Sequence, residues 1–85
     1  MDIKETLNER QGTHGDFTDN AITAQHLKRC LHNSKYWDGK DEIEQEAMDM
    51  ICHKLARWVS CPNYHGDTPK DIAGYATLVV ERLGE

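Results

Sequence analysis

The chain has 85 residues, of which 38% are hydrophobic and only 7% aromatic. This length fits a single helical domain, residues 1–85, whose own core is small, so we expect a homo-oligomer to complete it. Ten basic and 15 acidic residues give a net charge of −5, and no basic stripe is visible, which argues against direct nucleic-acid binding. An acidic chain can still bind a phosphorylated small molecule when metal ions bridge the two.

The cysteines and the N-terminus bear on the cellular compartment. Cys30, Cys52 and Cys61 include no C-x-x-C pair, which favours a reducing compartment and argues against a disulfide framework. The N-terminal MDIKETLNER is polar and unlike a signal peptide. No apolar run approaches the roughly 20 residues of a membrane span. We therefore expect a cytoplasmic protein that does not enter a membrane.

Helical periodicity predicts an all-α protein with a short leading helix and three main helices. The leading helix covers residues 2–11, and the first main helix runs from about residue 18 to residue 32. Its apolar side carries Ala24, Leu27 and Leu31. Asn20 falls on the same side, either as a residue of a capping turn or in a polar pocket between helices. Ile22, on the far side, could serve a subunit contact.

A connection is expected over residues 33–40, NSKYWDGK. Asn33 suits the end of a helix and Asp38-Gly39 is a turn signal. Tyr36 and Trp37 are too apolar for a bare loop, so we expect them to fold back on the core or to cover an interface.

The longest predicted helix is residues 41–61, a stretch that contains no proline or glycine and ends before Pro62. At about 100° per residue, it has an apolar stripe, predicted to form the core. The stripe carries Ala47, Met48, Ile51, Leu55, Trp58 and Val59, and the opposite side carries Glu42, Glu46, Asp49 and His53. The polar side can be a solvated face or part of a metal site.

The last helix is predicted to begin at Thr68-Pro69, with threonine as the cap and proline at the first position. Its apolar stripe carries Ile72, Ala76, Val79 and Leu83. Tyr75 flanks this stripe, where it could stack on a base or only fill space.

The tripeptide His-Gly-Asp occurs at residues 14–16 and again at 65–67, each time just before a predicted helix. The simpler interpretation is a turn followed by an aspartate near the positive end of a helix. The functional interpretation is that His14 and Asp16 face a ligand shared with the second copy.

Glu46 and Asp49 are three residues apart, so on a helix both carboxylates could reach one hard cation. Magnesium prefers oxygen ligands and leaves room for substrate phosphates. Lys54 and Arg57 could contact a phosphate or only extend along the surface, and Lys54 is the better candidate. A solvated acidic face remains the alternative.

Three segments together resemble a family of small phage and prophage proteins of unassigned function. They are ERQGTHGDFTDNA, EAMDMICHKLARW and DTPKDIAGYATLV. This family is grouped with the MazG-like, all-α nucleoside triphosphate pyrophosphohydrolases. The resemblance implies a protein in the host cytoplasm that binds a nucleotide, and magnesium-dependent release of pyrophosphate if it is an enzyme.

The MazG-like pattern has E-x-x-E on one helix and E-x-x-D on the next. Glu46 and Asp49 match the second element, and no E-x-x-E occurs between residues 18 and 32. The resemblance implies Glu46 and Asp49 as catalytic, metal-holding residues, and we expect Asp71 to join them in place of the missing element. The substrate-binding candidates are His14, Asp16, Asn20, Lys54 and Tyr75, which the family pattern itself does not assign. The alternative is a non-catalytic inhibitor of host defence, which either sequesters a nucleotide signal or binds a host protein.

Overall fold

The fold is all-α in the computed structural model, which describes residues 3–4, 16–63 and 66–84. Three helices follow one another in the chain: α2 (Phe17–His32), α3 (Glu42–Ser60) and α4 (Asp67–Leu83). No strand occurs in these described residues, so the predicted fold class is confirmed. The predicted leading helix lies outside the described residues apart from positions 3 and 4.

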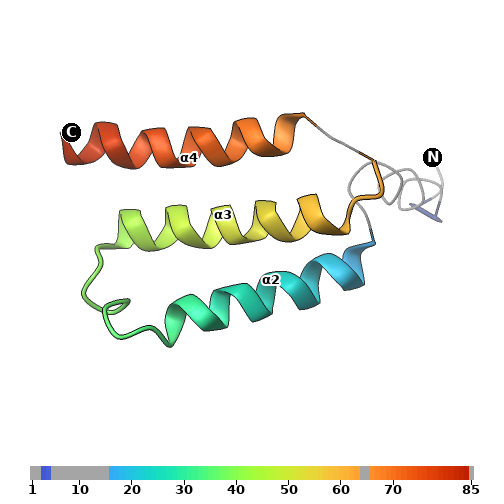
Figure 1. Ribbon diagram of the computed structural model, residues 1–85, viewed down its shortest axis with the longest axis horizontal. Coiled ribbons are helices and arrows are strands. Elements are labelled where there is room, and N and C mark those ends of the chain that lie inside the picture. The colour runs from blue at the N-terminus through green and yellow to red at the C-terminus, as the bar shows by residue number, and fades with distance from the viewer. Residues whose placement is uncertain (1–2, 5–15, 64–65, 85) are drawn as a thin grey trace.

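The three helices lie side by side in one antiparallel layer, with α3 in the middle (Figure 1). α3 packs against both neighbours, whereas α2 and α4 make no comparable contact with each other. Neighbouring helices therefore cover two opposite sides of α3, and each of its other two sides is part of one face of the layer.

The residues that flank helix α2 form hydrogen bonds with backbone groups at its two ends. The Asp16 carboxylate is the N-cap and accepts a hydrogen bond from the Asp19 backbone N–H at 3.3 Å. Asn33 is the C-cap, and its N–H donates to the Arg29 carbonyl at 3.0 Å. The capping interpretation of the first His-Gly-Asp copy is thus confirmed for its aspartate.

The connection from α2 to α3 treats its two aromatic residues differently. The Trp37 ring lies against the His32 ring, with centroids 4.5 Å apart, and its carbonyl accepts a hydrogen bond from Gln45 Nε2 at 3.0 Å. Trp37 therefore folds back on the helices as predicted. Tyr36 does not, because 68% of it is exposed.

Helix α3 matches the predicted segment within a residue at each end. Asp41 caps it by accepting from the Glu44 backbone N–H at 2.8 Å, and Cys61 closes it in front of Pro62. The predicted start of α4 was wrong. Gly66 takes up helical backbone angles as the N-cap, so the helix begins before Thr68, and the threonine is buried in the first turn instead of capping it.

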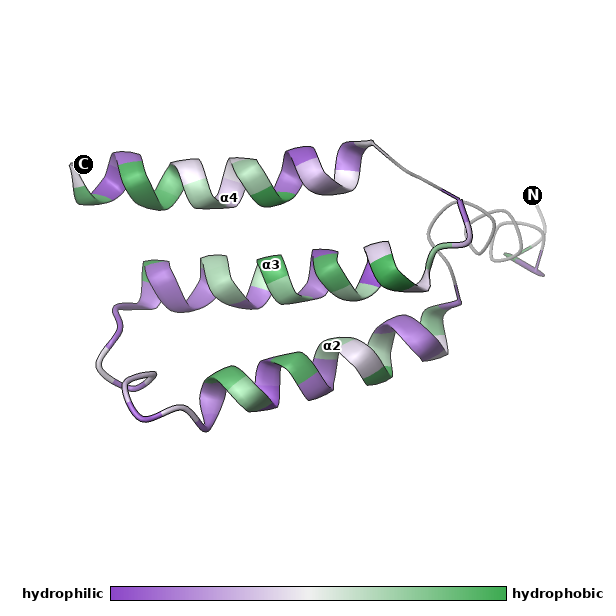
Figure 2. Cartoon of the chain, in the orientation of Figure 1, coloured by the Kyte–Doolittle hydropathy of each residue, from purple (hydrophilic) through white to green (hydrophobic). Residues whose placement is uncertain are grey.

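The buried part of the described chain is small and lacks any large side chain. It consists of Ala24, Ala47, Cys52, Ala56 and Thr68. These small residues let the helices approach closely, and they fill little volume. Green and purple stretches alternate along each helix in Figure 2, so each helix has an apolar and a polar side. Most large apolar side chains remain at least partly exposed.

Contacts at the edges of α3 show which side chains occupy the two faces of the layer. Asp49 of α3 forms an ion pair with α2, and Lys54 of α3 forms an ion pair with α4. Because successive residues of an α-helix are rotated by about 100°, these two contacts determine on which side of α3 every other side chain lies. We call one side the apolar face, formed by Met48, Ile51, Leu55, Trp58 and Val59 of α3 with Ala76, Val79 and Leu83 of α4. We call the other side the polar face, formed by Lys28 and His32 of α2, Glu46, Asp49, His53, Lys54 and Arg57 of α3, and Asp71 and Tyr75 of α4; the apolar residues Ile43 and Met50 of α3 lie among them.

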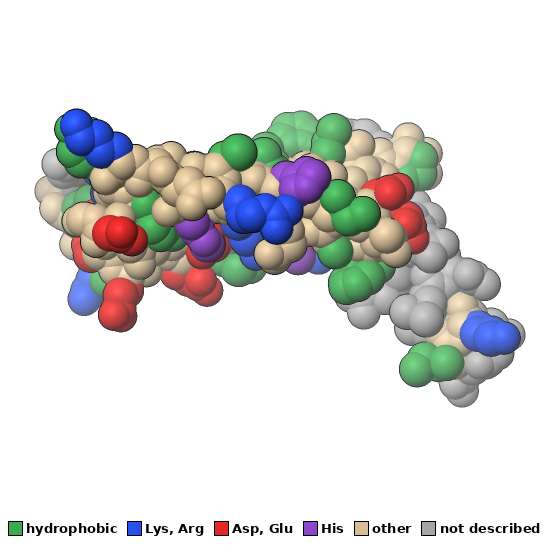
Figure 3. All heavy atoms as spheres, turned by 90° about the horizontal axis from the view of Figure 1, so that it is seen from below, with side chains coloured by type: hydrophobic (Ala, Val, Ile, Leu, Met, Phe, Trp, Pro, Cys, Tyr) green, Lys and Arg blue, Asp and Glu red, His purple; other side chains and the backbone are tan. Residues whose placement is uncertain are grey.

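The α2 edge of the layer is mixed in character. Viewed from this side, hydrophobic side chains lie at the surface among basic, acidic and histidine side chains (Figure 3). Within the described residues, no helix is both long and apolar enough to cross a membrane.

Candidate anion-binding site on the polar face

One ion pair sets how α2 and α3 are aligned. His32 Nε2 lies 2.7 Å from Asp49 Oδ1. Because the helices are antiparallel, Lys28, one turn before His32, comes opposite His53, one turn after Asp49. Lys54 and Arg57 follow on the same stretch of α3. The alignment therefore gathers three cationic side chains around one histidine.

His53 reports the electrostatics of this cluster. It is half-buried, and its pKa lies below the ordinary 6.5 because burial disfavours the charged ring and the Arg57, Lys28 and Lys54 cations repel a further positive charge. The Arg57 Nη2 atom lies 3.4 Å from His53 Nε2. A guanidinium can only donate, so the neutral imidazole accepts at Nε2 and carries its proton on Nδ1.

The cations of the cluster are only partly neutralised by carboxylates. Lys54 Nζ lies 3.0 Å from Asp71 Oδ2 of α4, and the Lys54 side chain is 14% exposed. Within the described residues, neither Lys28 nor Arg57 has a carboxylate within ion-pair distance. Lys28 and Arg57 are themselves half-buried. Lys28 and Arg57 are thus partly dehydrated cations without a carboxylate partner in the described part of the chain, on a face where three carboxylates accompany three cations.

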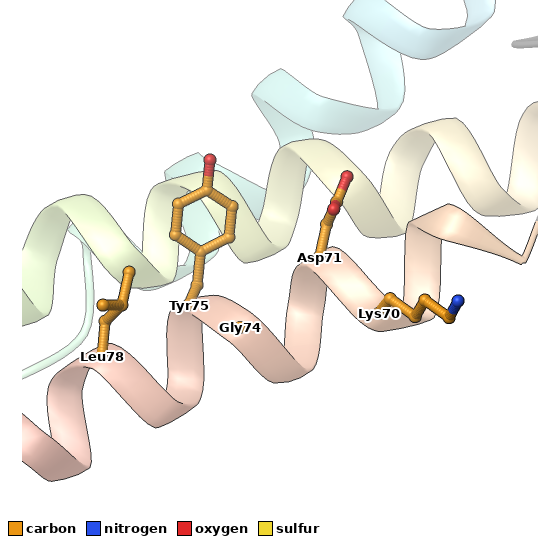
Figure 4. A pocket seen from close by; sticks show the side chains of 5 residues that line it. All are labelled: Lys70, Asp71, Gly74, Tyr75 and Leu78. Carbon is orange, nitrogen blue, oxygen red and sulfur yellow. The ribbon is translucent and has the colours of Figure 1, made fainter.

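A hollow adjoins the cluster on the α4 side. It has a volume of about 360 Å³ and is lined by Lys70, Asp71, Gly74, Tyr75 and Leu78. In Figure 4, Asp71 and Tyr75 point from α4 in the direction of α3. Asp71 belongs both to the hollow and to the ion pair with Lys54, so it links the hollow to the cations.

The predicted metal ligands are not brought together. Asp49 is turned to His32 of α2, Asp71 is paired with Lys54 on the other edge of α3, and Glu46 is exposed. Within the described residues, no three His, Cys, Asp or Glu side chains are grouped as metal ligands. The physical reason is the central position of α3, because Asp49 lies between α3 and α2 and Asp71 lies between α4 and α3.

The predicted substrate-binding residues fall in different places. Lys54 and Tyr75 lie on the polar face, and Tyr75 lines the hollow. Asp16 is the cap of α2, and Asn20 is half-buried in its first turn, where its backbone N–H donates to the Asp16 carbonyl at 3.0 Å. The N-cap of α2 is therefore Asp16. Asn20, for which a place in the capping turn was one of the two predicted roles, is not the cap. His14 lies outside the described residues.

Sequence reasoning missed Lys28 and His32 and assigned His53 only to the acidic column. Lys28 and His32 are four residues apart on one side of α2, which is a weak signal, because their importance depends on what the next helix places opposite them. Cys52, beside this site, is buried, and burial raises the pKa of its thiol, with a smaller contribution from Asp49. It stays protonated, which makes it a poor nucleophile.

The fold and the site define the chain as a small all-α protein in which one layer of three helices has a partly buried cationic cluster on one face. Residues 2–83 match a family described as a domain of unknown function, DUF6378. The chain belongs to this family. No curated protein and no solved structure matches it.

Proposed function

We propose that the polar face binds the phosphate groups of a nucleotide or a nucleotide-derived small molecule and holds that ligand without cleaving it. The observation that supports this most strongly is that Arg57 Nη2 lies 3.4 Å from His53 Nε2, and that Arg57, Lys28 and Lys54 all lower the pKa of His53. Partly dehydrated like charges raise the free energy of the folded chain. A bound phosphate offsets that cost, and the guanidinium can engage two of its oxygens at once.

The hollow beside Asp71 provides a place for the remainder of such a ligand. It is an open depression of about 360 Å³ lined by residues of α4 alone, so the part of a ligand lying there would stay exposed on one side. Tyr75 offers an aromatic surface for a nucleobase and Leu78 an apolar wall. A ligand lying along the polar face would place its phosphates at the cations and its base at Tyr75.

Binding without cleavage is supported better than hydrolysis by the placement of the carboxylates. Two-metal or single-metal phosphoryl chemistry needs several oxygen ligands converging on one position. The described residues supply no such group, and Asp49 is already engaged with His32. Magnesium enters this proposal only as a counter-ion carried on the ligand's phosphates, and a phage-type sequestering role fits a binder of this kind.

A thermal-shift screen of nucleotides and cyclic dinucleotides, with and without magnesium, tests the proposal. At least one of these ligands should raise the unfolding temperature and should be recovered chemically intact after the protein is denatured. No shift with any phosphorylated ligand contradicts the binding proposal. Release of pyrophosphate in the presence of magnesium contradicts the non-catalytic part and favours the pyrophosphohydrolase alternative.

A further inference from the structure

The apolar face contains the stripe of α3 that the sequence predicts as core, yet the stripe is not covered within the described chain. Leu55 is 40% exposed, Trp58 is 41% exposed and Val59 is 74% exposed. They follow one another along the central helix of the layer, so their exposed surfaces join. Apolar surfaces of this extent on a small protein generally mark an interaction site.

A groove between α3 and α4 continues the same surface. It has a volume of about 220 Å³ and is lined by Glu44, Ala47, Met48, Ile51, Ala76 and Val79. Five of these six side chains are apolar. Leu83, one helical turn after Val79, is 49% exposed and extends the surface along α4.

We propose that a second copy of this chain packs on the apolar face, giving a homodimer of two helical layers with the polar faces outward. The first argument is the size of the core. The described chain buries only small residues, and oligomerisation is one of the ways in which a small domain gains the buried apolar surface that its own core lacks. A second copy is the partner available at equal concentration wherever the chain is made.

The second argument is charge. Each chain has a net charge of −5, so two copies repel unless the surfaces that meet are nearly uncharged. The α3 and α4 side chains that define the apolar face are all uncharged, and the groove adds only Glu44. Two such faces related by a two-fold axis meet without opposing a row of like charges.

The third argument is area. α3 has 19 residues and is therefore about 28 Å long, and α3 and α4, spaced 8–10 Å apart, make a face roughly 18 Å wide. The apolar face thus measures roughly 500 Å², and two such faces bury about 1,000 Å². A specific interface should bury at least about 1,000 Å² in total, so the apolar face reaches the lower limit for a dimer.

Light scattering coupled to size-exclusion chromatography of the full chain tests the inference. The expected mass is twice the 9.8 kDa of one chain, and Leu55→Glu and Val59→Glu should each shift it to the monomer. Ile22→Glu is the matched control, because Ile22 is 52% exposed on α2 and lies outside the apolar face. A native monomer, or a dimer dissociated by Ile22→Glu but not by Leu55→Glu, overturns the inference.

A second measurement keeps the inference testable if the glutamate variants fail to fold. For a dimer whose subunits are stabilised by association, the unfolding temperature of the unmodified chain rises with protein concentration. We expect a rise of several degrees over a hundredfold change in concentration. An unfolding temperature independent of concentration overturns the inference.

Discussion

A substitution in the ion pair between Lys54 and Asp71 distinguishes two hypotheses: that the ligand binds to the cations, or that it binds to a metal held by carboxylates. If phosphate binds to the cationic cluster, Asp71 competes with it for Lys54. The substitution Asp71→Asn then frees the Lys54 ammonium and removes a negative charge close to the ligand. If Asp71 instead holds a metal needed for binding, the same substitution weakens binding. The two accounts therefore predict changes of opposite sign.

The size of the effect follows from the geometry. Asp71 Oδ2 lies 3.0 Å from Lys54 Nζ, so a phosphate oxygen on the other side of that ammonium would lie about 6 Å from the carboxylate at ordinary hydrogen-bond lengths. Two unit charges 6 Å apart repel by about 0.7 kcal/mol in water and about 3 kcal/mol in a partly buried setting. The Asp71 side chain is 46% exposed, so we expect about 1 kcal/mol, or roughly fivefold tighter binding.

Isothermal titration calorimetry of the ligand found in the screen checks this prediction. Asp67→Asn is the matched control, because Asp67 is an exposed aspartate at the start of the same helix and its replacement changes the net charge equally. Asp67→Asn should leave the affinity nearly unchanged. Binding that Asp71→Asn weakens or abolishes, with the fold intact by circular dichroism, would refute the reasoning.

Three further predictions concern stability and pH. The pKa of His53 in the folded chain lies below 6.5, so the unfolded chain binds more protons than the folded chain just below that pH. The unfolding free energy should therefore decrease as the pH falls through this window. Denaturation at pH 7.5 and at pH 5.5 checks this, and the decrease should be smaller in the His53→Gln variant. A bound phosphate should favour protonated His53, so calorimetric affinity should increase over the same fall in pH, and an affinity that weakens instead speaks against the site. Ala56 is fully buried, so Ala56→Leu should lower the unfolding free energy in urea by about 1–3 kcal/mol, whereas a neutral result would mean that α3 is not held closely at this point.

Much of the fold could be predicted because helix ends are decided by neighbouring residues. Asn33 and Cys61-Pro62 end their helices where the sequence placed them. The start of α4 was missed because a glycine that adopts helical angles leaves no sequence signal, whereas Thr68-Pro69 gives a strong one. Periodicity also grouped the apolar residues of α3 correctly.

Which side of each helix is covered by a neighbouring helix could not be predicted in the same way. Periodicity shows which side chains share a side of a helix, and it contains no information about which neighbour lies on that side. The stripe through Leu55 was therefore expected in the core, yet it lies on an open face. For the same reason Glu46 and Asp49 looked like a pair on the sequence, while α2 engages Asp49 through His32.

The cationic cluster depends on an alignment between helices that no local motif records. Lys28 and His53 are separated by a loop and a helix end, and they come together only because α2 and α3 are antiparallel with His32 beside Asp49. A sequence can show that a basic residue lies on the polar side of a helix. It does not show that three of them lie on one face while only one of the three forms an ion pair with a carboxylate of the described residues.

The most direct test of phosphate binding at the cluster is a calorimetric titration that compares loss of a cation inside it with loss of a cation outside it. Arg57→Gln and Lys28→Gln remove cations that no carboxylate of the described residues neutralises, and Lys40→Gln removes one from an exposed loop. Each of the first two should weaken binding at least tenfold, since charged hydrogen bonds contribute about 1.5–3 kcal/mol, while Lys40→Gln should bind as the unmodified chain does. Equal affinities for all three variants would contradict the assignment of the site.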